Sequence, residues 1–172
     1  MTSMESGPGL TLGATAREYQ LGTGLRATVL TTSEETDGRH DLIEGRQAPG
    51  EATALHLHTR YEERLWVVGG SMTVWAGEEV SQLRSGDFCR IPMNVPHAIK
   101  AGDEGCHALN VSSPAGFAAL VERAGTPLDQ FRLGSELDLD LFMAVTTELG
   151  DVVLGPPGTV PTDLPLGTRP AR

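Results

Sequence analysis

The sequence is poor in basic residues and in cysteine. It holds 13 lysine and arginine residues against 23 aspartate and glutamate residues, a formal net charge of −10 at pH 7. Nucleic acids and anionic membranes both attract a basic face, so this charge argues against either as a partner. The two cysteines, Cys89 and Cys106, stand in no CxxC or zinc-ribbon spacing and are expected to be reduced structural thiols.

Long apolar runs are also missing. No stretch approaches the length of about 20 residues that a membrane-spanning helix needs, and the N-terminus has no basic region followed by an apolar run. We therefore expect a cytoplasmic protein. The 21 glycines and 11 prolines are spread between short apolar runs, which is typical of an all-β domain rich in turns.

Two histidines, His56 and His58, stand one residue apart at the start of a β-type run. Side chains at positions i and i+2 of a strand point to the same face, about 7 Å apart along the chain. Both imidazoles can thus converge on one point, and hairpin pairing could bring a glutamate of the next strand there. Neutral imidazole together with carboxylate suits a divalent transition metal.

A second stretch, residues 86–99, supplies a third histidine. Its strand over residues 88–91 ends at Pro92, and the chain turns at Asn94, which tolerates left-handed backbone. His97 follows at the start of another strand.

These two stretches resemble the motifs of the cupin family. The first motif is a glycine, five residues, His-x-His, three or four residues, a glutamate, six residues and a glycine. Its longer spacing fits Gly50, His56, His58, Glu63 and Gly70, and its shorter spacing fits Gly50, His56, His58, Glu62 and Gly69. The second motif is matched by Gly86, Pro92 and His97, with Asn94 in place of a glycine.

The choice between Glu62 and Glu63 rests on strand parity as well as on the resemblance. With Glu63 inward, Leu65 also faces inward, and Arg64 lies on the outer face. With Glu62 inward, Arg64 would face the core without an obvious partner, which is costly. Both arguments favour Glu63, although spacing alone leaves Glu62 open.

The resemblance implies an all-β fold, a cupin jelly-roll β-barrel with one or two C-terminal helices. It also implies one divalent transition metal ion (Fe, Ni, Co, Mn, Cu or Zn), held by His56, His58, Glu63 and His97. The segment 112–117, with a helix after it, is similar to small single-domain cupins of the quercetin 2,3-dioxygenase group. That similarity implies a metal-dependent dioxygenase of a flavonol-like or other enolised aromatic molecule, in which Glu63 also acts catalytically by taking the substrate proton.

Two other classes stay open. One is a non-oxidative cupin enzyme, such as an isomerase, cyclase, decarboxylase or lyase, acting on a small enolisable substrate. The other is a cupin that binds a small molecule without catalysis. An inward-facing Arg90 would separate the dioxygenase from the non-oxidative enzyme, because a buried arginine would anchor a substrate carboxylate or phosphate. The candidate pocket residues are Leu65, Met72, Phe88, Arg90, His107 and Asn110.

The chain is expected to form one barrel with additions at both ends. We expect a disordered or extended arm over residues 1–16, the barrel over 17–114, a helical extension over 115–154 and a Pro-rich tail over 155–172. Gly69–Gly70 and residues 102–105 are expected to be turns between separate strands. One helix is predicted over 116–124 and a second over 136–149 with Ser135 as its cap, and similarity to other cupins favours a homodimer.

Overall fold

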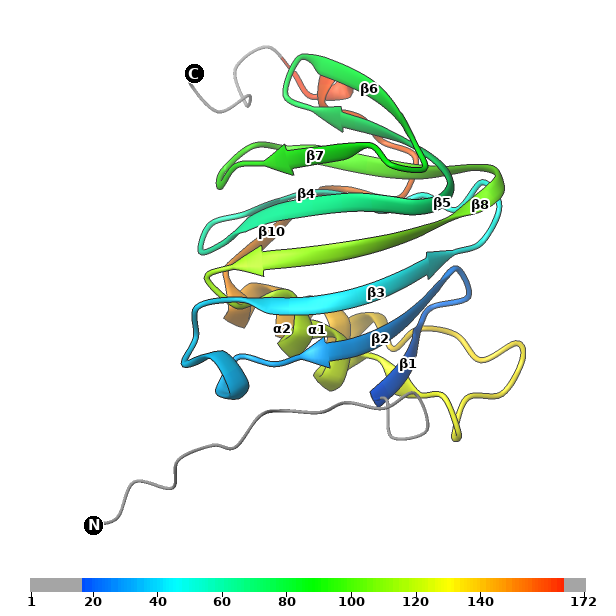
Figure 1. Cartoon of the computed structure of the whole chain (residues 1–172), viewed down its shortest axis with the longest axis vertical. Helices are drawn as coiled ribbons and strands as arrows, with labels where there is room; N and C mark the ends of the chain where they lie inside the picture. The colour runs from blue at the N-terminus through cyan, green and yellow to red at the C-terminus, as the bar shows by residue number, and fades with distance from the viewer. Residues whose placement is uncertain (1–16, 166–172) are drawn as a thin grey trace.

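A computed structural model describes residues 17–165, so the predicted N-terminal arm and the end of the tail lie outside the described residues. The described part is mostly β, with two α-helices after the main strands (Figure 1). The strands are β1 (Arg17–Leu21), β2 (Leu25–Thr31), β3 (Asp41–Gln47), β4 (Leu55–His58), β5 (Glu62–Ala76), β6 (Glu79–Arg84), β7 (Phe88–Ile91), β8 (His97–Ser113), β9 (Thr126–Pro127) and β10 (Asp151–Gly155). The α-helices are α1 (Phe117–Ala124) and α2 (Leu139–Leu149), and single 3-10 turns lie at Glu34–Thr36 and Pro161–Asp163.

Strands β5 and β8 are the two long strands on which the fold is built. They pair antiparallel with each other over nearly their whole length. The second half of β8 also pairs with β3, and its first residue pairs with β4, while β5 pairs with β6 and β7. The predicted jelly roll is confirmed, although within residues 17–165 the hydrogen-bonded path ends at β10 and β9 and does not close into a ring.

Two expected turns are bends within continuous strands. The sequence predicted that Gly69–Gly70 and residues 102–105 would separate four strands, and that prediction is wrong. The register of β5 on β8 shifts on both sides of Gly69–Gly70, so both strands bend at the same place. Gly70 has φ +70°, and a Cβ on it would overlap the backbone carbonyl of Gly105. Glycine is therefore required where the two strands cross closely.

Replacing Gly70 with alanine is expected to lower the free energy of unfolding by about 3 kcal/mol, because strain in the left-handed region adds to overpacking. Gly69→Ala is the matched control, since its Cβ would meet nothing nearer than the His107 Cβ at 3.9 Å. The control should stay within about 1 kcal/mol of the parent. Urea unfolding measures the free energy of unfolding of both variants. An equal loss in the two variants would contradict the claim that Gly70 is required where β5 and β8 approach closely.

Alternate side chains of β5 point into the core. Glu63, Leu65 and Val67 are buried, whereas the Trp66 side chain is 52% exposed, so the predicted parity is confirmed. The main cluster of buried residues comprises Leu65, Val67, Met72, Val74, Leu83, Ile91, Ile99, Ala101, Cys106 and Ala108. Cys106 lies in this cluster as a free thiol, and Cys89 is free as well.

The two helices lie side by side (Figure 1), with α1 packed against β1, β2 and β3 and α2 packed against β10. Helix α1 ends at Gly125 as predicted, and the buried Asp41 carboxylate accepts hydrogen bonds from the backbone N–H groups of Gly116 and Ala118 at its start. The start predicted for the second helix is wrong. Helix α2 begins at Leu139, because Asp138 caps it by accepting from the Leu141 N–H at 2.9 Å. Neither helix is long or apolar enough to cross a membrane.

Candidate metal centre

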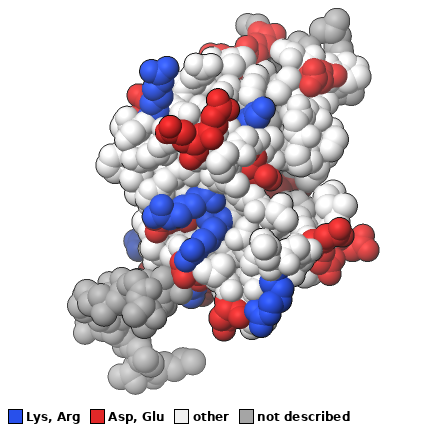
Figure 2. Space-filling view, turned by 90° about the vertical axis from the view of Figure 1, so that its right-hand side faces the viewer, with Lys and Arg blue, Asp and Glu red and all other residues white. Residues whose placement is uncertain are grey.

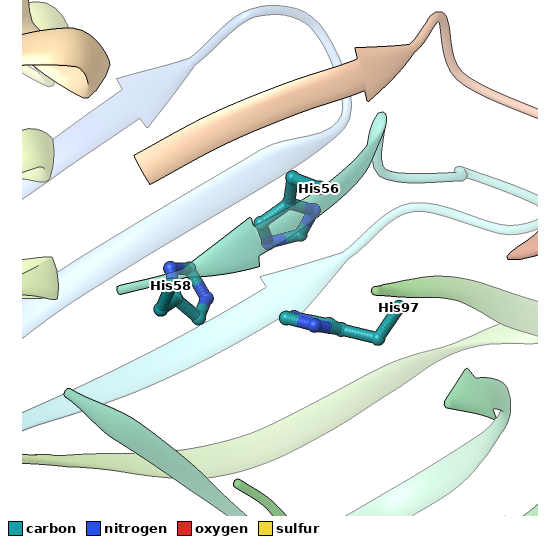
Figure 3. Close-up of side chains that lie close together, drawn as sticks. All are labelled: His56, His58 and His97. Carbon is teal, nitrogen blue, oxygen red and sulfur yellow. The ribbon is translucent and has the colours of Figure 1, made fainter. Parts of the chain in front are cut away.

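Three imidazoles meet on the inner face of the barrel (Figure 3). His56 and His58 come from β4, and His97 comes from the first position of β8, where it pairs in register with His56. The potential ligand atoms of the three rings lie within 4.8 Å of one another. The His-x-His spacing therefore brings both β4 histidines to one point, and the end of the β7–β8 turn brings the third.

Each of the three rings is held by a hydrogen bond at Nδ1. The Nδ1 of His56 lies 2.8 Å from the Ala54 carbonyl oxygen, and that of His97 lies 2.9 Å from the Val95 carbonyl oxygen. The Nδ1 of His58 lies 2.7 Å from Oδ1 of Asp151. An acceptor at Nδ1 keeps a proton there, so each ring, once its Nε2 is deprotonated, presents the Nε2 lone pair for a ligand bond.

Glu63 completes the cluster, and Glu62 does not. The Glu63 side chain is buried, with Oε2 at 3.3 Å from Nε2 of His97 and at 3.8 Å from Nε2 of His58. Glu62 lies on the opposite face of β5, where it forms ion pairs with Arg64 and Arg90. The alternation of β5 thus decides which of the two glutamates faces the histidines.

The polar atoms at the centre of this cluster have no hydrogen-bond partner within the described residues. They are Nε2 of His58, Nε2 of His97 and Oε2 of Glu63, and all three are buried. Leaving buried polar atoms unpaired is costly, and such groups call for an explanation such as an ion. Imidazole nitrogens and one carboxylate oxygen that face a common point fit a divalent transition metal.

Burial and neighbouring charges shift the pKa values of Glu63, His58 and His56. Burial raises the pKa of Glu63, but neighbouring His58 and His97 outweigh burial and hold it well below its usual range. Burial likewise lowers the pKa of His58, yet the Asp151 hydrogen bond and the Glu63 carboxylate together raise it to about 9. Burial and the charges of the other two histidines lower the pKa of His56 to about 3. Glu63 is therefore ionised, and its negative charge favours a cation at this place.

A cavity of about 70 Å³ adjoins Glu63 inside the barrel. Three of the candidate pocket residues, Leu65, Met72 and Asn110, line it, and the amide nitrogen of Asn110 donates a hydrogen bond to Oε1 of Glu63. The amide oxygen of Asn110 is buried and has no partner within the described residues. The remaining lining residues are Leu25, Ile43, Gly45, Gln47, Thr53, Ile99, Cys106, Ala108 and Phe117.

Three predicted pocket residues are not in this cavity. Phe88 is 61% exposed and Arg90 forms an ion pair with Glu62 outside, because β7 turns Cys89 and Ile91 inward. His107 also lies outside, with Nε2 at 2.7 Å from Glu44. In both strands the alternation of side chains places the neighbouring residue inside. His40, the fifth histidine, is exposed.

Sequence reasoning missed two residues of the cluster, Asp151 and Tyr61. Both are buried, and the Tyr61 hydroxyl donates to Oδ2 of Asp151 at 3.1 Å. Asp151 is 93 positions from His58, so no local spacing connects them. The available signal was a lone carboxylate at the start of a short apolar run directly after the helix-ending Gly150.

Comparisons with known proteins agree with this architecture. A cupin-domain family model matches residues 44–112. Quercetin 2,3-dioxygenase of Bacillus subtilis (strain 168) is 24% identical over 101 residues, which cover 59% of this chain and 30% of that protein. Quercetin 2,3-dioxygenase of Aspergillus japonicus is 34% identical over 76 residues, 41% of this chain and 22% of that protein. The chain therefore spans less than a third of these relatives.

Solved structures share the fold at low sequence identity. KdgF from a Halomonas species has a TM-score of 0.57 at 17% identity, over 63% of this chain and 94% of that one. The polyketide cyclase RemF from Streptomyces resistomycificus has a TM-score of 0.54 at 20% identity, over 62% and 80%. The nucleoside dehydratase Pac13 has a TM-score of 0.54 at 11% identity, over 82% and 86%.

Proposed function

We propose, because residues 44–112 form a cupin domain, that this chain is a metal-dependent dioxygenase acting on a flavonol-like or other enolised molecule. The observation that carries the metal site is the convergence of three imidazoles whose Nδ1 atoms are all engaged, which leaves three Nε2 atoms to bind one ion. Similarity to two quercetin 2,3-dioxygenases supports the oxidative reaction.

His56, His58, His97 and Glu63 would hold the ion, which is Fe, Ni, Co, Mn, Cu or Zn. A bound ion would act as a Lewis acid on an enol oxygen and, with a redox-active metal, bring the enol together with O2. Glu63 would also take the hydroxyl proton by releasing its Oε2 from the ion, since this oxygen is ionised and has no hydrogen-bond partner within the described residues. Asn110 orients this carboxylate by donating to its other oxygen.

One observation favours a second candidate, a non-oxidative reaction on a smaller substrate. The cavity measures about 70 Å³, whereas pockets for drug-sized molecules measure about 300–1,000 Å³. A flavonol would require this cavity to open, and a small enolisable molecule would need much less room. The polyketide cyclase and the nucleoside dehydratase among the structural neighbours support a non-oxidative reaction on this fold. The cavity lining contains no lysine or arginine, which favours a neutral substrate.

Oxygen uptake separates the two candidates. Protein loaded separately with each of the six metals would be assayed with quercetin and with a small β-diketone, a neutral enolisable molecule. Uptake that depends on both metal and substrate, and that Glu63→Gln reduces at least tenfold, would support the dioxygenase. If every metal form fails to consume oxygen while the diketone is turned over, the non-oxidative reaction is favoured and the first proposal fails.

The homodimer stays a prediction. Its support is an apolar groove of about 430 Å³ on the outer face of the sheet, where Trp66 and Phe88 are exposed. Light scattering measures the mass in solution, and the mass of a single chain would contradict the homodimer.

The cytoplasmic location and the lack of a nucleic-acid partner also stay predictions. On the face in Figure 2, basic side chains stand beside acidic ones, which is consistent with the second.

A further inference from the structure

The end of β4 is tied to the C-terminal segment, which lies outside the residues that the cupin model matches. His58 pairs in register with Asp151 of β10. The next residue, Thr59, donates from both its backbone N–H and its hydroxyl to the Gly150 carbonyl oxygen, at 3.1 and 2.6 Å. Arg60 donates to the Glu148 carbonyl oxygen at 2.9 Å. Every residue from His58 to Tyr61 thus contacts the segment from the end of α2 to the start of β10.

Asp151 uses both of its oxygens in this contact. Oδ1 lies 2.7 Å from Nδ1 of His58, and Oδ2 accepts from the Tyr61 hydroxyl at 3.1 Å. The Tyr61 ring also stacks on the His58 ring, with centroids 4.2 Å apart and planes 25° from parallel. The His58 imidazole is therefore fixed at one edge by a carboxylate and on one face by an aromatic ring.

The other two imidazoles are held differently. His56 and His97 each donate to the backbone carbonyl two residues earlier, at Ala54 and Val95. Those anchors belong to the same stretch of chain as the histidine, so they form as soon as the local backbone forms. The anchor of His58 is charged and comes from a strand 93 positions away.

We propose that Asp151 is a positioning residue of the metal centre, acting through His58, and that Tyr61 holds Asp151 in place. This inference rests on the proposed metal site. It makes the segment from α2 to β10 part of that site, in addition to the two cupin motifs. A carboxylate behind a ligand histidine fixes the ring orientation and strengthens Nε2 as a donor, and losing such a partner typically costs 10–100-fold in metal affinity.

The test measures Co(II) affinity of the full chain by chelator competition, together with the visible spectrum of bound Co(II). Asp151→Ala should weaken Co(II) binding about 100-fold and Asp151→Asn about 10-fold, since the amide oxygen can still accept from Nδ1. Tyr61→Phe should weaken it less than Asp151→Asn does. The spectrum should change in all three variants, because a ligand ring with altered orientation alters the field at the ion.

The matched control is Asp41→Asn. Asp41 is also a buried aspartate at the start of a strand, but its carboxylate caps α1. This variant should keep the parent's Co(II) affinity and spectrum even if its thermal stability changes. A purely structural role for Asp151 would instead make both aspartate variants lose stability while both bind Co(II) as the parent does.

The outcomes separate this inference from the proposed function. A parent chain that does not bind Co(II) overturns the metal site itself. A parent that binds, with Asp151→Asn and Tyr61→Phe equal to it in affinity and spectrum, overturns only the role of Asp151. Both variants preserve side-chain volume, so they decide the question even if Asp151→Ala fails to fold.

Hydrogen exchange supplies a second readout. Binding is reciprocal, so if β10 strengthens the metal site, the metal must in turn stabilise β10. Adding Co(II) should slow amide exchange over Asp151–Gly155 in the parent, and the slowing should be much smaller in Asp151→Asn. Exchange in β10 that does not respond to bound Co(II) would contradict the linkage.

Discussion

Replacing His97 with alanine should weaken metal binding by more than about 100-fold. This exceeds the loss of about 10–100-fold that is typical when only the hydrogen-bond partner of a ligand is removed. The His97 side chain is 0% exposed, and its Nε2 lies 3.3 Å from Oε2 of Glu63. Alanine removes a candidate ligand and leaves a space with no other described histidine near enough to replace it. Elemental analysis after metal loading and gel filtration measures this loss. The metal content should fall from about one ion per chain in the parent to a small fraction of that in the variant.

His107→Ala is the matched control. His107 also lies in β8 and is also an imidazole next to a carboxylate, but its partner is Glu44 on the outer face. This variant should retain the full metal content. Equal metal content in both variants would mean that His97 does not hold the ion, and the proposed site would then be wrong.

Metal loading should raise the midpoint of thermal unfolding by roughly 5–15 °C. A ligand that binds only the folded state at 100 to 1,000 times its Kd contributes about 2.7–4.1 kcal/mol. For a chain of 172 residues, each kcal/mol shifts the midpoint by about 2–4 °C. The rise is expected because the ion would satisfy buried atoms of His58, His97 and Glu63 that have no hydrogen-bond partner among residues 17–165. Differential scanning calorimetry with each metal, before and after a chelator, measures it.

The His97→Ala variant supplies the control for this shift. Its unfolding midpoint should be nearly the same with and without metal, whereas His107→Ala should shift as the parent does. A rise of similar size in His97→Ala would mean that the ion stabilises some other part of the chain.

The residues at the site come from strands that are far apart in the sequence. The two cupin motifs supply the four candidate ligands, and β8 supplies Asn110, which orients Glu63. The C-terminal segment supplies Asp151 behind His58. A fragment that ended near residue 114 would hold every candidate ligand and still lack the carboxylate that fixes one of them.

Sequence alone determined the candidate donor set and its orientation. The resemblance of Gly50–Gly70 and Gly86–His97 to the cupin motifs pointed to three histidines, and the alternation through Arg64 favoured Glu63 over Glu62. The choice of Glu63 agrees with the structure because side-chain direction in a strand depends only on local backbone geometry, which repeats every two residues. The same rule would have placed Phe88 and His107 outside if strand register had been known.

Only the tertiary structure decided the rest. The continuous bends of β5 and β8 depend on the close approach of Gly70 to Gly105, and the contact of His58 with Asp151 joins residues 93 positions apart. The cavity of about 70 Å³ is set by side chains from several strands and from α1. Contacts between distant segments follow from how the strands pair and pack, and no short stretch of sequence carries that information.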